Sequence, residues 1–505
     1  MLAVANVIQR ILGLVREAVK VAFFGATGTL DAFTLAEFMP QTLYQLIAGG
    51  EMVSSSLVPV FSEYAAKKNK DELWSAVSIT FSIVTVIMVG LVILTELFTP
   101  VVAGLLGAKN LTDSGLLPLT VQLMRVTAPA MLFLSVSSIM TAALNSLERF
   151  TWPAFTISLF NASIIVAAFL FPNNVSSLAW GMLIGSFLMI VLQLPGLSDA
   201  KLRFQLDFGH PVVIRIMRLY APILLGLFVN QFSLAFGFNL ATSTGEGAAS
   251  LMRTSTTLYQ LPIGLVVVAL STAILPTLSQ QANRPLQEFK RTLAGGLRLV
   301  IALILPAAIG LFALAPAIIN LLFQRREFGP LQTELTAQIL RIDLIGLPFA
   351  GIDLMLIYAS YARKDTLRPA LVGVVSVVFY VVAASILTAS YALPGLMAAN
   401  AGKIIVHTIL MLILLQRNLD GLRGFGVSGI FFRSLFAALL TGLVSWVTWY
   451  YLSGLLGSGT FASKLLPVLI PGGLGLFVYL IVANKLGIEE VRHLTNLLPF
   501  KPRLK

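Results

Sequence analysis

The sequence predicts an all-α polytopic membrane protein, and three observations carry this prediction. The chain has 505 residues, of which 57% are hydrophobic and only 11% are charged. Its mean hydropathy is +0.90, which soluble globular proteins of this length do not reach. Apolar stretches of ~20 or more residues recur along the chain, and this length suits membrane helices rather than the shorter strands of a β-barrel.

We predict fourteen membrane spans, separated by short loops. Their expected ranges are 2–25, 30–64, 73–107, 115–145, 150–172, 175–198, 211–240, 246–281, 287–323, 331–361, 367–391, 393–416, 430–454 and 463–486. Several ranges exceed the ~20 residues of a straight crossing, so we expect tilted or extended helices. Prolines inside the spans are expected to mark kinks that neighbouring helices stabilise. They are Pro40, Pro59, Pro129, Pro222, Pro262 and Pro276.

Lysine and arginine gather in alternate loops, which places the loops after even-numbered spans and both termini in the cytoplasm. These residues are Lys67, Lys68, Lys70, Arg149, Lys201, Arg203, Arg284, Lys290, Arg291, Arg363, Lys364, Arg368, Arg417 and Arg423, with Lys501, Arg503 and Lys505 in the tail. Arg325 and Arg326 are the exception to this pattern. The pattern also explains the net charge of +12 without nucleic acid as a partner.

An internal repeat relates the two halves of the chain. Residues 42–46 and 257–261 both read Thr-Leu-Tyr-Gln-Leu, and three further pairs follow in the same order: 58–62 with 275–279, 122–125 with 338–341, and 153–154 with 369–370. The offset stays between 215 and 217 residues. A repeat of six helices keeps its orientation, so we predict a parallel pseudo-repeat, a common transporter plan. The expected parts are a lobe of 1–210, a lobe of 211–425, and two added helices with a basic tail in 426–505.

Basic residues inside the first span predict a site for an anion. Arg10, Gly13, Arg16 and Lys20 are spaced by three, three and four residues and therefore share one helix face. A charge at mid-bilayer costs at least ~2.5–3.5 kcal/mol, so this face is expected to line a bundle interior or a watery cavity. Asp31 follows just beyond the next turn. A structural alternative has Arg10 and Lys20 extending to opposite interfaces while Arg16 pairs with an acid.

Three further spans carry polar residues. Glu51 follows Gly49-Gly50 in the second span, and Arg253 lies near the start of the eighth span, the repeat mate of the second. Lys403 and His407 are one helical turn apart in the twelfth span, and we interpret them as part of a hydrogen-bond cluster inside the bundle. Arg253 is a stronger functional candidate than Lys403 and His407, because its span is the repeat mate of the second span, which carries polar residues.

Enzyme signatures are absent from the sequence. It contains no Walker-type phosphate loop, nucleophile elbow or local metal-ligand motif, so we predict neither an enzyme nor a cofactor. A cation-drug exporter would need a cavity rich in acids and aromatics, whereas the first span gathers arginines. An inactive membrane scaffold is the alternative from a different class.

Several motifs resemble one known family over nearly the whole chain. They are Arg10-Ile-Leu-Gly-Leu-Val-Arg16-Glu17, Phe24-Gly25-Ala26, Asp31-Ala32-Phe33, residues 58–64, 143–150 and 153–155, Leu178-Ala179-Trp180, Gln193-Leu194-Pro195, Pro222, Gln231, residues 274–279, Leu322-Phe323-Gln324 and residues 361–369. Together with the fourteen expected helices, they resemble the MurJ (MviN) lipid II flippases of the multidrug/oligosaccharidyl-lipid/polysaccharide exporter superfamily.

The resemblance implies a fold and an activity. Two six-helix lobes would enclose a V-shaped cavity, and the last two helices would form a groove for a long lipid tail. Undecaprenyl-diphosphate-linked peptidoglycan precursor, or a related polyprenyl-diphosphate glycolipid, would be moved from the cytoplasmic to the external leaflet of the bacterial cytoplasmic membrane. Arg10, Arg16 and Asp31 match the family's cavity residues. A monomer is expected, with the cell-wall synthesis machinery as a candidate partner.

This chain also departs from the family pattern. Gln45 and Thr257 stand where family members commonly have arginine. Arg253 lies one turn before Thr257 and is expected to substitute for it, whereas Lys20 is a weak replacement at the first position. Some members bind sodium with acids in spans 7 and 11, which here contain neither Asp nor Glu, so membrane potential is the favoured energy source. Another lipid-linked oligosaccharide remains an alternative substrate.

Overall fold

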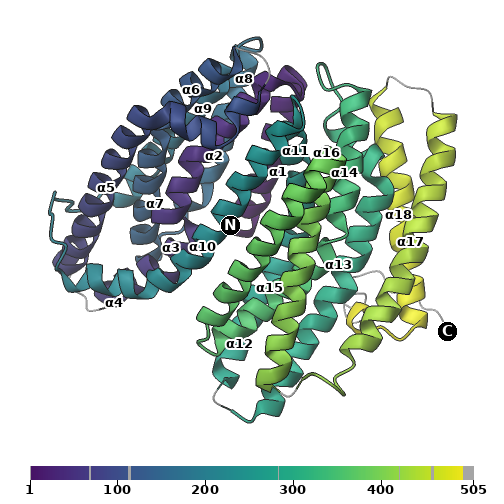
Figure 1. Ribbon diagram of the computed structural model, residues 1–505. Helices are drawn as coiled ribbons and strands as arrows, with labels where there is room; N and C mark the ends of the chain where they lie inside the picture. Colours follow the sequence, from purple (N-terminus) through teal and green to yellow (C-terminus); the bar gives the residue numbers. More distant parts are fainter. Residues whose placement is uncertain are drawn as a thin grey trace. The chain divides into compact units, whose positions relative to one another are not determined.

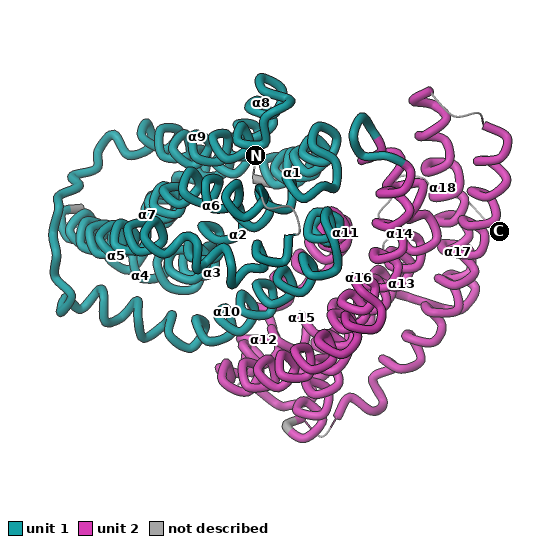
Figure 2. Tube along the Cα trace, turned by 45° about the horizontal axis from the view of Figure 1, so that its top comes forward, with its two compact units in different colours: residues 1–253, 325–329 teal, residues 254–324, 330–505 magenta. Residues whose placement is uncertain are grey.

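The computed structural model describes residues 2–66, 70–111, 115–282, 284–419, 421–456 and 460–492, and the regular structure in these residues is helical. The chain divides into two compact units, residues 1–253 with 325–329 and residues 254–324 with 330–505 (Figure 2). Lys67, Lys68, His493 and the basic residues of the tail lie outside the described residues.

The predicted class of an all-helical membrane protein is confirmed. Among the described residues, ten helices are long and apolar enough to cross a membrane, or eleven with the bent pair α14 (Pro330–Leu344) and α15 (Leu347–Ala362). The first helix, α1 (Leu2–Phe24), carries four charged residues and is not one of these ten. Arg16, Glu17 and Lys20 of this helix are bound to side chains within the protein, as described below.

The first unit is a bundle of helices that runs from α1 to the start of α11 (Figure 1). Its elements are α1, α2 (Gly28–Ala48), α3 (Gly50–Met52), α4 (Val58–Ala66), α5 (Lys70–Leu105), α6 (Leu116–Thr127), α7 (Ala130–Ser146), α8 (Thr156–Leu170), α9 (Ser176–Gln193), α10 (Pro211–Ser243) and the first residues of α11 (Ala248–Pro262). Helix α8 packs along both α9 and α1, and α2 packs on α6 and α7. The expected kink at Pro129 is the junction of α6 and α7.

A tight turn joins α1 to α2. Gly25 has a left-handed φ of +63°, and a Cβ there would press against the Glu327 backbone of the returning segment 325–329. Thr27 caps α2, because its side chain accepts a hydrogen bond from the Leu30 amide. Arg326, an exception to the basic-loop pattern, lies over the Phe23 ring at 4.1 Å, so its cation contacts an aromatic face of the same unit.

The second predicted span, 30–64, is interrupted rather than continuous. Gly49 is extended, with ψ 177°, and ends α2, after which the five residues Val53–Leu57 form a π-helical turn before α4. A second π-helical turn, Ile263–Val267, separates α11 from α12 (Val268–Gln281) in the repeat-related span. Pro59 lies just after the first widened turn, and Pro262 lies just before the second. Pro59 lacks an N–H and crowds the turn that precedes it, which is the widened turn Val53–Leu57.

Helix α10 belongs to the first unit, although the repeat predicted a lobe boundary at residues 210 and 211. Packing explains this assignment, because α10 lies against α2 and α5. The Tyr220 hydroxyl donates hydrogen bonds to the carbonyls of Gln45 and Leu46, at 3.3 and 3.0 Å, in the last turn of α2. The repeat-based division into 1–210, 211–425 and 426–505 concerns sequence duplication and stays a prediction.

The second unit centres on the long helix α13 (Leu286–Leu322). Helices α14, α15, α17 (Val427–Leu455) and α18 (Phe461–Lys485) pack against it, and α17 also packs along α18. The Tyr479 hydroxyl of α18 donates a hydrogen bond to the Ala302 carbonyl of α13. Helices α17 and α18 correspond to the two added helices of the prediction, and they belong to this unit.

The chain breaks inside α16 (Leu367–Leu419), where two separate spans were expected to meet near residue 392. Ala392 has a φ of 51° and a ψ of −139°, which no helix contains. A Cβ on Gly395 would meet the Leu387 carbonyl, so the backbone folds closely on itself at this point. The break therefore coincides with the predicted boundary.

Two identical helix ends, one in each unit, support the internal repeat. Arg149 N–H donates to the Leu144 carbonyl at 2.8 Å after the left-handed Glu148 (φ 60°), and Asp365 N–H donates to the Ser360 carbonyl at 3.0 Å after the left-handed Lys364 (φ 62°). These six-to-one bonds are those of the Schellman motif. The two motifs are separated by the offset of the sequence repeat. This agreement comes from backbone geometry and does not depend on which residue types form the motifs.

Candidate anion site in the first unit

Arg16 and Lys20 lie one turn apart on α1, as their spacing predicted, and both are bound to carboxylates. The Arg16 guanidinium donates to Glu17 Oε1 at 2.6 Å and lies 3.5 Å from Glu37 Oε1. Lys20 Nζ lies 2.8 Å from Glu37 Oε2 and 3.1 Å from Glu17 Oε2. Arg16 thus pairs with acids, as the structural alternative expected, while Lys20 is only 2% exposed and is bound to the same two carboxylates.

The two acids come from different helices and hold α1 against α2. Glu17 lies on α1 and Glu37 on α2, and each has only 3% of its side chain exposed. Gln41, one turn after Glu37, donates to Glu37 Oε1 at 3.0 Å. Buried carboxylates need such partners, because an uncompensated charge in a low-dielectric interior is costly.

A third cation comes from α11 and a neutral partner from α8. Arg253 Nη2 lies 4.0 Å from Glu37 Oε1, and 30% of its side chain is exposed. Asn161 Oδ1 accepts a hydrogen bond from Arg16 Nη1 at 3.1 Å. Four helices, α1, α2, α8 and α11, thus contribute to one cluster in the first unit, which we call the cation cluster: Arg16, Glu17, Lys20, Glu37, Asn161 and Arg253.

The charges of the cation cluster do not cancel. Arg16, Lys20 and Arg253 supply three positive charges against the two carboxylates, which leaves one positive charge. Lys20 is enclosed, whereas Arg253 is the most exposed member of the three. An anion would therefore be met by guanidinium groups, which suit phosphate oxygens because they present paired donors.

Arg10 and Gly13 extend the same face of α1. Arg10 lies six residues before Arg16, which is ~9 Å along a helix, and is partly buried. A Cβ on Gly13 would lie 3.7 Å from the Asn161 amide nitrogen, an ordinary contact. Gly13 therefore allows α8 to approach α1 without being sterically obligatory.

Asp31, predicted as a cavity residue, is fully buried and bound to the start of α11. Its Oδ1 accepts hydrogen bonds from the Ser250 amide at 2.7 Å and the Ser250 hydroxyl at 2.6 Å. A carboxylate at a helix N-terminus stabilises the unpaired amides there. Since Arg253 lies three residues after Ser250, Asp31 holds the helix that carries Arg253.

Gln45, Glu51 and Thr257, also singled out in the sequence, are not members of the cation cluster. Gln45 is in the last turn of α2, eight residues or ~12 Å beyond Glu37, and its carbonyl accepts from Tyr220. Glu51 is exposed beyond the Gly49 break. Thr257 lies in the part of α11 that belongs to the second unit. Lys20, the weak replacement expected for the arginine missing at Gln45, does belong to the cluster.

Glu17, Glu37 and Asn161 were not among the predicted site residues. The two acids could have been found from the rule that ionisable groups within membrane helices pair with one another. Asn161 is 145 residues from Arg16, and no spacing in the sequence indicates their contact.

The second unit contains a separate buried polar group. His407 Nδ1 lies 2.7 Å from Asp353 Oδ1, and Asn400 donates to Asp343 Oδ1 at 2.8 Å. Lys403 Nζ lies 4.8 Å from the centre of the Tyr380 ring. His407 is hydrogen-bonded inside the bundle, as the interpretation expected, whereas Lys403 contacts an aromatic ring. The hydrogen bonds of His407 and Asn400 tie α15 and α14 to α16.

Apolar helices of membrane-span length, together with a buried charged cluster, define an integral membrane protein with a charged site inside its helix bundle. The chain belongs to the MurJ family, because the family model described as lipid II flippase MurJ matches residues 20–468. That family is named for a transport activity, in agreement with the predicted absence of enzyme function.

Known relatives agree with this assignment. A probable lipid II flippase MurJ of Bdellovibrio bacteriovorus is 30% identical over 84% of this chain and 82% of its own length. A probable lipid II flippase MurJ of Vibrio cholerae is 29% identical over 92% and 94%. The lipid II flippase MurJ of Burkholderia cenocepacia is 30% identical over 73% of each chain.

Solved structures share the fold. Lipid II flippase MurJ in an inward closed conformation superposes with a TM-score of 0.80 at 24% identity, over 98% of this chain and 99% of that one. An inward-facing multidrug resistance MATE family transporter of the MOP superfamily gives 0.72 at 14% identity, over 82% and 95%. At these identities the two comparisons show a shared fold.

Proposed function

We propose that this protein moves lipid II from the cytoplasmic to the external leaflet of the bacterial cytoplasmic membrane for cell-wall synthesis. The observation that carries the proposal is the family match over residues 20–468. The cation cluster fits this substrate chemically, because a diphosphate that leaves water needs buried cationic donors to replace its hydration.

Within the cation cluster, the residues have different roles. Arg16 and Arg253 contact the diphosphate, and Arg10 meets the same headgroup further along α1. Lys20 is bound to two carboxylates and orients them rather than contacting substrate. Asp31 positions Arg253 through the start of α11. Gly13 provides close packing beside these groups, whereas Gln45, Glu51 and Thr257 are secondary contacts of the substrate path.

A fourteen-span topology with both termini in the cytoplasm completes the proposal. In the described residues, fourteen segments result when α2 to α4, α6 with α7, α11 with α12 and α14 with α15 each count as one span and α16 counts as two. The repeated helix ends at Glu148 and Lys364 support two parallel six-helix lobes, 1–210 and 211–425. The last two helices, within 426–505, would hold the lipid tail, and the protein works as a monomer by alternating access.

Complementation in cells depleted of their own lipid II flippase tests this function. The intact chain should restore growth, Arg16→Ala should not, and Gly13→Ala should, because an added Cβ there meets Asn161 only at ordinary contact distance. Membrane levels of all variants are compared by immunoblotting. Failure of the intact, well-expressed chain to support growth would favour an inactive scaffold.

A second candidate is a flippase for another polyprenyl-diphosphate oligosaccharide, and Gln45 and Thr257 favour it because they lack the charges common in the family. Reconstituted vesicles can compare lipid II with a polyprenyl-diphosphate glycan that lacks the peptide. Faster transfer of the glycan would assign the protein to the second substrate.

A further inference from the structure

A pair of ionisable residues joins two helices of the second unit. His407 Nδ1, on the second half of α16, lies 2.7 Å from Asp353 Oδ1 on α15, and 15% of each side chain is exposed. His407 lies 12 residues before the end of α16 at Leu419, which is ~18 Å along a helix and places it well inside the span. The proposed flipping step uses neither residue.

The internal repeat provides a comparison for this pair. In the first unit the corresponding helices, α7 and α9, are joined by neutral residues, because Gln193 Nε2 donates to the Ser137 hydroxyl at 2.7 Å. Asp353 comes 216 residues after Ser137, and His407 comes 214 residues after Gln193, so the two pairs occupy matching places to within one residue of the repeat offset. A neutral pair therefore suffices to join these helices. Ionisable groups are more costly to bury, so the pair of the second unit requires a further explanation.

The Asp353–His407 pair can accept a proton at one defined atom. An ionised Asp353 only accepts hydrogen bonds, so His407 Nδ1 carries a hydrogen and the lone pair of the neutral ring is on Nε2. Nε2 faces Gly373 on the first half of α16, where an added Cβ would lie 3.9 Å away. A proton that adds to Nε2 gives an imidazolium, whose charge lies beside the Asp353 carboxylate.

Other titratable groups lie around the pair on three helices. They are Asp343 on α14, Lys403 and Tyr380 on α16, and Tyr259 on α11. The Tyr259 hydroxyl is buried and has no hydrogen-bond partner among the described residues, which leaves it available to a water molecule. Gly351 and Met355 face α13, so Asp353, two residues from each, is on the opposite side of α15. Helix α12 and the π-helical turn Ile263–Val267, which also pack against α15, contain no ionisable residue.

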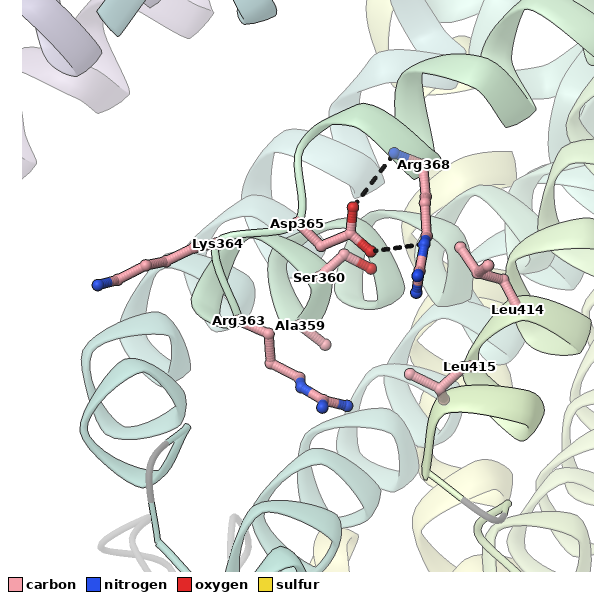
Figure 3. A pocket seen from close by; sticks show the side chains of 8 residues that line it. All are labelled: Ala359, Ser360, Arg363, Lys364, Asp365, Arg368, Leu414 and Leu415. Carbon is pink, nitrogen blue, oxygen red and sulfur yellow. Dashed lines mark hydrogen bonds and ion pairs between the residues drawn. The ribbon is translucent and has the colours of Figure 1, made fainter.

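A cavity of about 370 Å³ lies two helical turns from the pair. Ser360 of α15 and Leu414 of α16 line it, and each comes seven residues, or ~10 Å, after Asp353 or His407 on the same helix face. Polar and charged side chains from residues 360–368 surround the cavity at the turn between the two helices (Figure 3). The proposed topology places this turn in the cytoplasm, so the cavity is an entrance for cytoplasmic water.

One apolar layer separates the cavity from the pair. Leu356 comes three residues after Asp353, and Met411 comes four residues after His407, so both lie on the faces that carry the pair. Leu356 is 0% exposed and Met411 is 1% exposed. The cavity therefore ends about one turn short of the pair. A coupled ion must reach its site from one side of the membrane at a time, as alternating access requires.

We propose that the Asp353–His407 pair is a proton-coupling site, which takes up one proton from the external side and releases it through this cavity to the cytoplasm in each flipping cycle. This rests on the proposed flippase function. The proton adds to His407 Nε2 and leaves from the same atom, so the Nε2–H bond is the one that forms and breaks. Histidine and carboxylate groups inside membrane helices serve as proton relays in transporters. An inward-moving proton carries one positive charge, so the membrane potential and a pH gradient both drive it.

Flipping in proteoliposomes at zero membrane potential tests the coupling. Equal potassium on both sides with valinomycin removes the potential, and a pH difference of one unit is imposed with the external side acidic. The ratio of lipid II between the leaflets should shift by up to about tenfold towards the external leaflet, because one pH unit is a tenfold ratio of proton concentrations.

Two variants make the test specific to the pair. Asp353→Ser combined with His407→Gln reproduces the neutral pair of the first unit, so it should keep the thermal stability of the protein and still flip lipid II, but lose the response to the pH gradient. His210→Asn is the matched control, because it removes a histidine outside the pair and keeps a side chain that can cap α10. It should respond to the pH gradient as the unaltered chain does.

A second measurement depends neither on flipping nor on a variant that folds. The chain has three histidines, so purified protein labelled with nitrogen-15 histidine gives few imidazole signals in nuclear magnetic resonance spectra. The signal lost in His407→Gln belongs to His407, and in the unaltered chain it should change protonation state between about pH 5 and pH 8. A His407 ring that keeps one protonation state over this range would overturn the proposal.

The possible failures can be told apart. Flipping with the same leaflet ratio with and without the pH gradient would overturn proton coupling and leave the flippase function intact. A pH response that persists in the double variant would place the proton site elsewhere and would also overturn the proposal. Absence of flipping by the unaltered chain under every condition would contradict the proposed function and, with it, the coupling.

Discussion

Lys20 of α1 and Glu37 of α2 form a buried ion pair, with 2.8 Å between Nζ and Oε2. Lys20 also lies 3.1 Å from Glu17, so one ammonium joins the two carboxylates of the cation cluster. Each carboxylate in turn contacts Arg16, at 2.6 Å for Glu17 and 3.5 Å for Glu37. Lys20 therefore determines where the acids lie, and the acids determine where the Arg16 guanidinium points.

Lys20→Ala is expected to destabilise the protein strongly. Removing one partner of a buried ion pair typically costs about 3–5 kcal/mol, because the remaining charge stays buried without compensation. Thermal unfolding of the purified protein in detergent measures the effect. The double variant Lys20→Met with Glu37→Gln removes both charges and should be more stable than the single variant. Equal stability of the two variants would contradict the importance of the pair.

Arg253→Ala should have the opposite profile, with little loss of stability and a large loss of transport. Arg253 is 30% exposed and only 4.0 Å from Glu37, and such partly exposed pairs contribute at most about 1 kcal/mol. Flipping assays in vesicles and thermal unfolding of the same preparation separate the two effects.

The replacement of a family arginine can be tested in the same variant. Adding Thr257→Arg to Arg253→Ala should restore much of the lost transport, because residues four apart on a helix lie ~5–6 Å from each other. Full activity of Arg253→Ala alone would remove Arg253 from the site.

Much of the fold could be predicted from the sequence, because hydrophobic length and proline position act locally. The boundary expected near residue 392 coincides with the break at Ala392, and the kink at Pro129 separates α6 from α7. The interruption at Gly49 and the π-helical turns were not predicted. The Gln45 and Leu46 carbonyls in the turn before Gly49 accept hydrogen bonds from Tyr220, a tertiary contact that the local sequence does not reveal.

The candidate site could be predicted only in part. Helical spacing correctly placed Arg16 and Lys20 on one face, because that relation lies within one helix. Spacing cannot tell which residues of other helices meet that face. The contacts of Arg16 with Glu37 and Asn161, and the burial of Asp31 against Ser250, therefore required the tertiary structure.

Asp31 is predicted to be a positioning residue. Asp31→Leu removes the acceptor for two Ser250 donors and should lower the free energy of unfolding by at least roughly 1.5–3 kcal/mol, the contribution of one hydrogen bond to a charged group. Asp31→Asn keeps an acceptor oxygen and should retain the fold with partial transport. Thermal unfolding and substrate affinity are measured together. An Asp31→Asn variant with native stability but no substrate binding would instead indicate direct contact with the substrate.

Membrane potential, rather than sodium, is predicted to drive transport. Helix α10 and residues 367–391 of α16 contain neither Asp nor Glu, so they lack the carboxylates with which some relatives bind sodium. The cation cluster carries one net positive charge. Moving one charge through 100 mV changes the free energy by ~2.3 kcal/mol, which is sufficient to favour one orientation of the cluster. In vesicles with an imposed potassium diffusion potential, valinomycin-controlled collapse of the potential should slow flipping several-fold. Replacing sodium by choline at constant potential should leave the flipping rate unchanged. A flipping rate that depends on the sodium concentration under those conditions would show that the potential is not the source of energy.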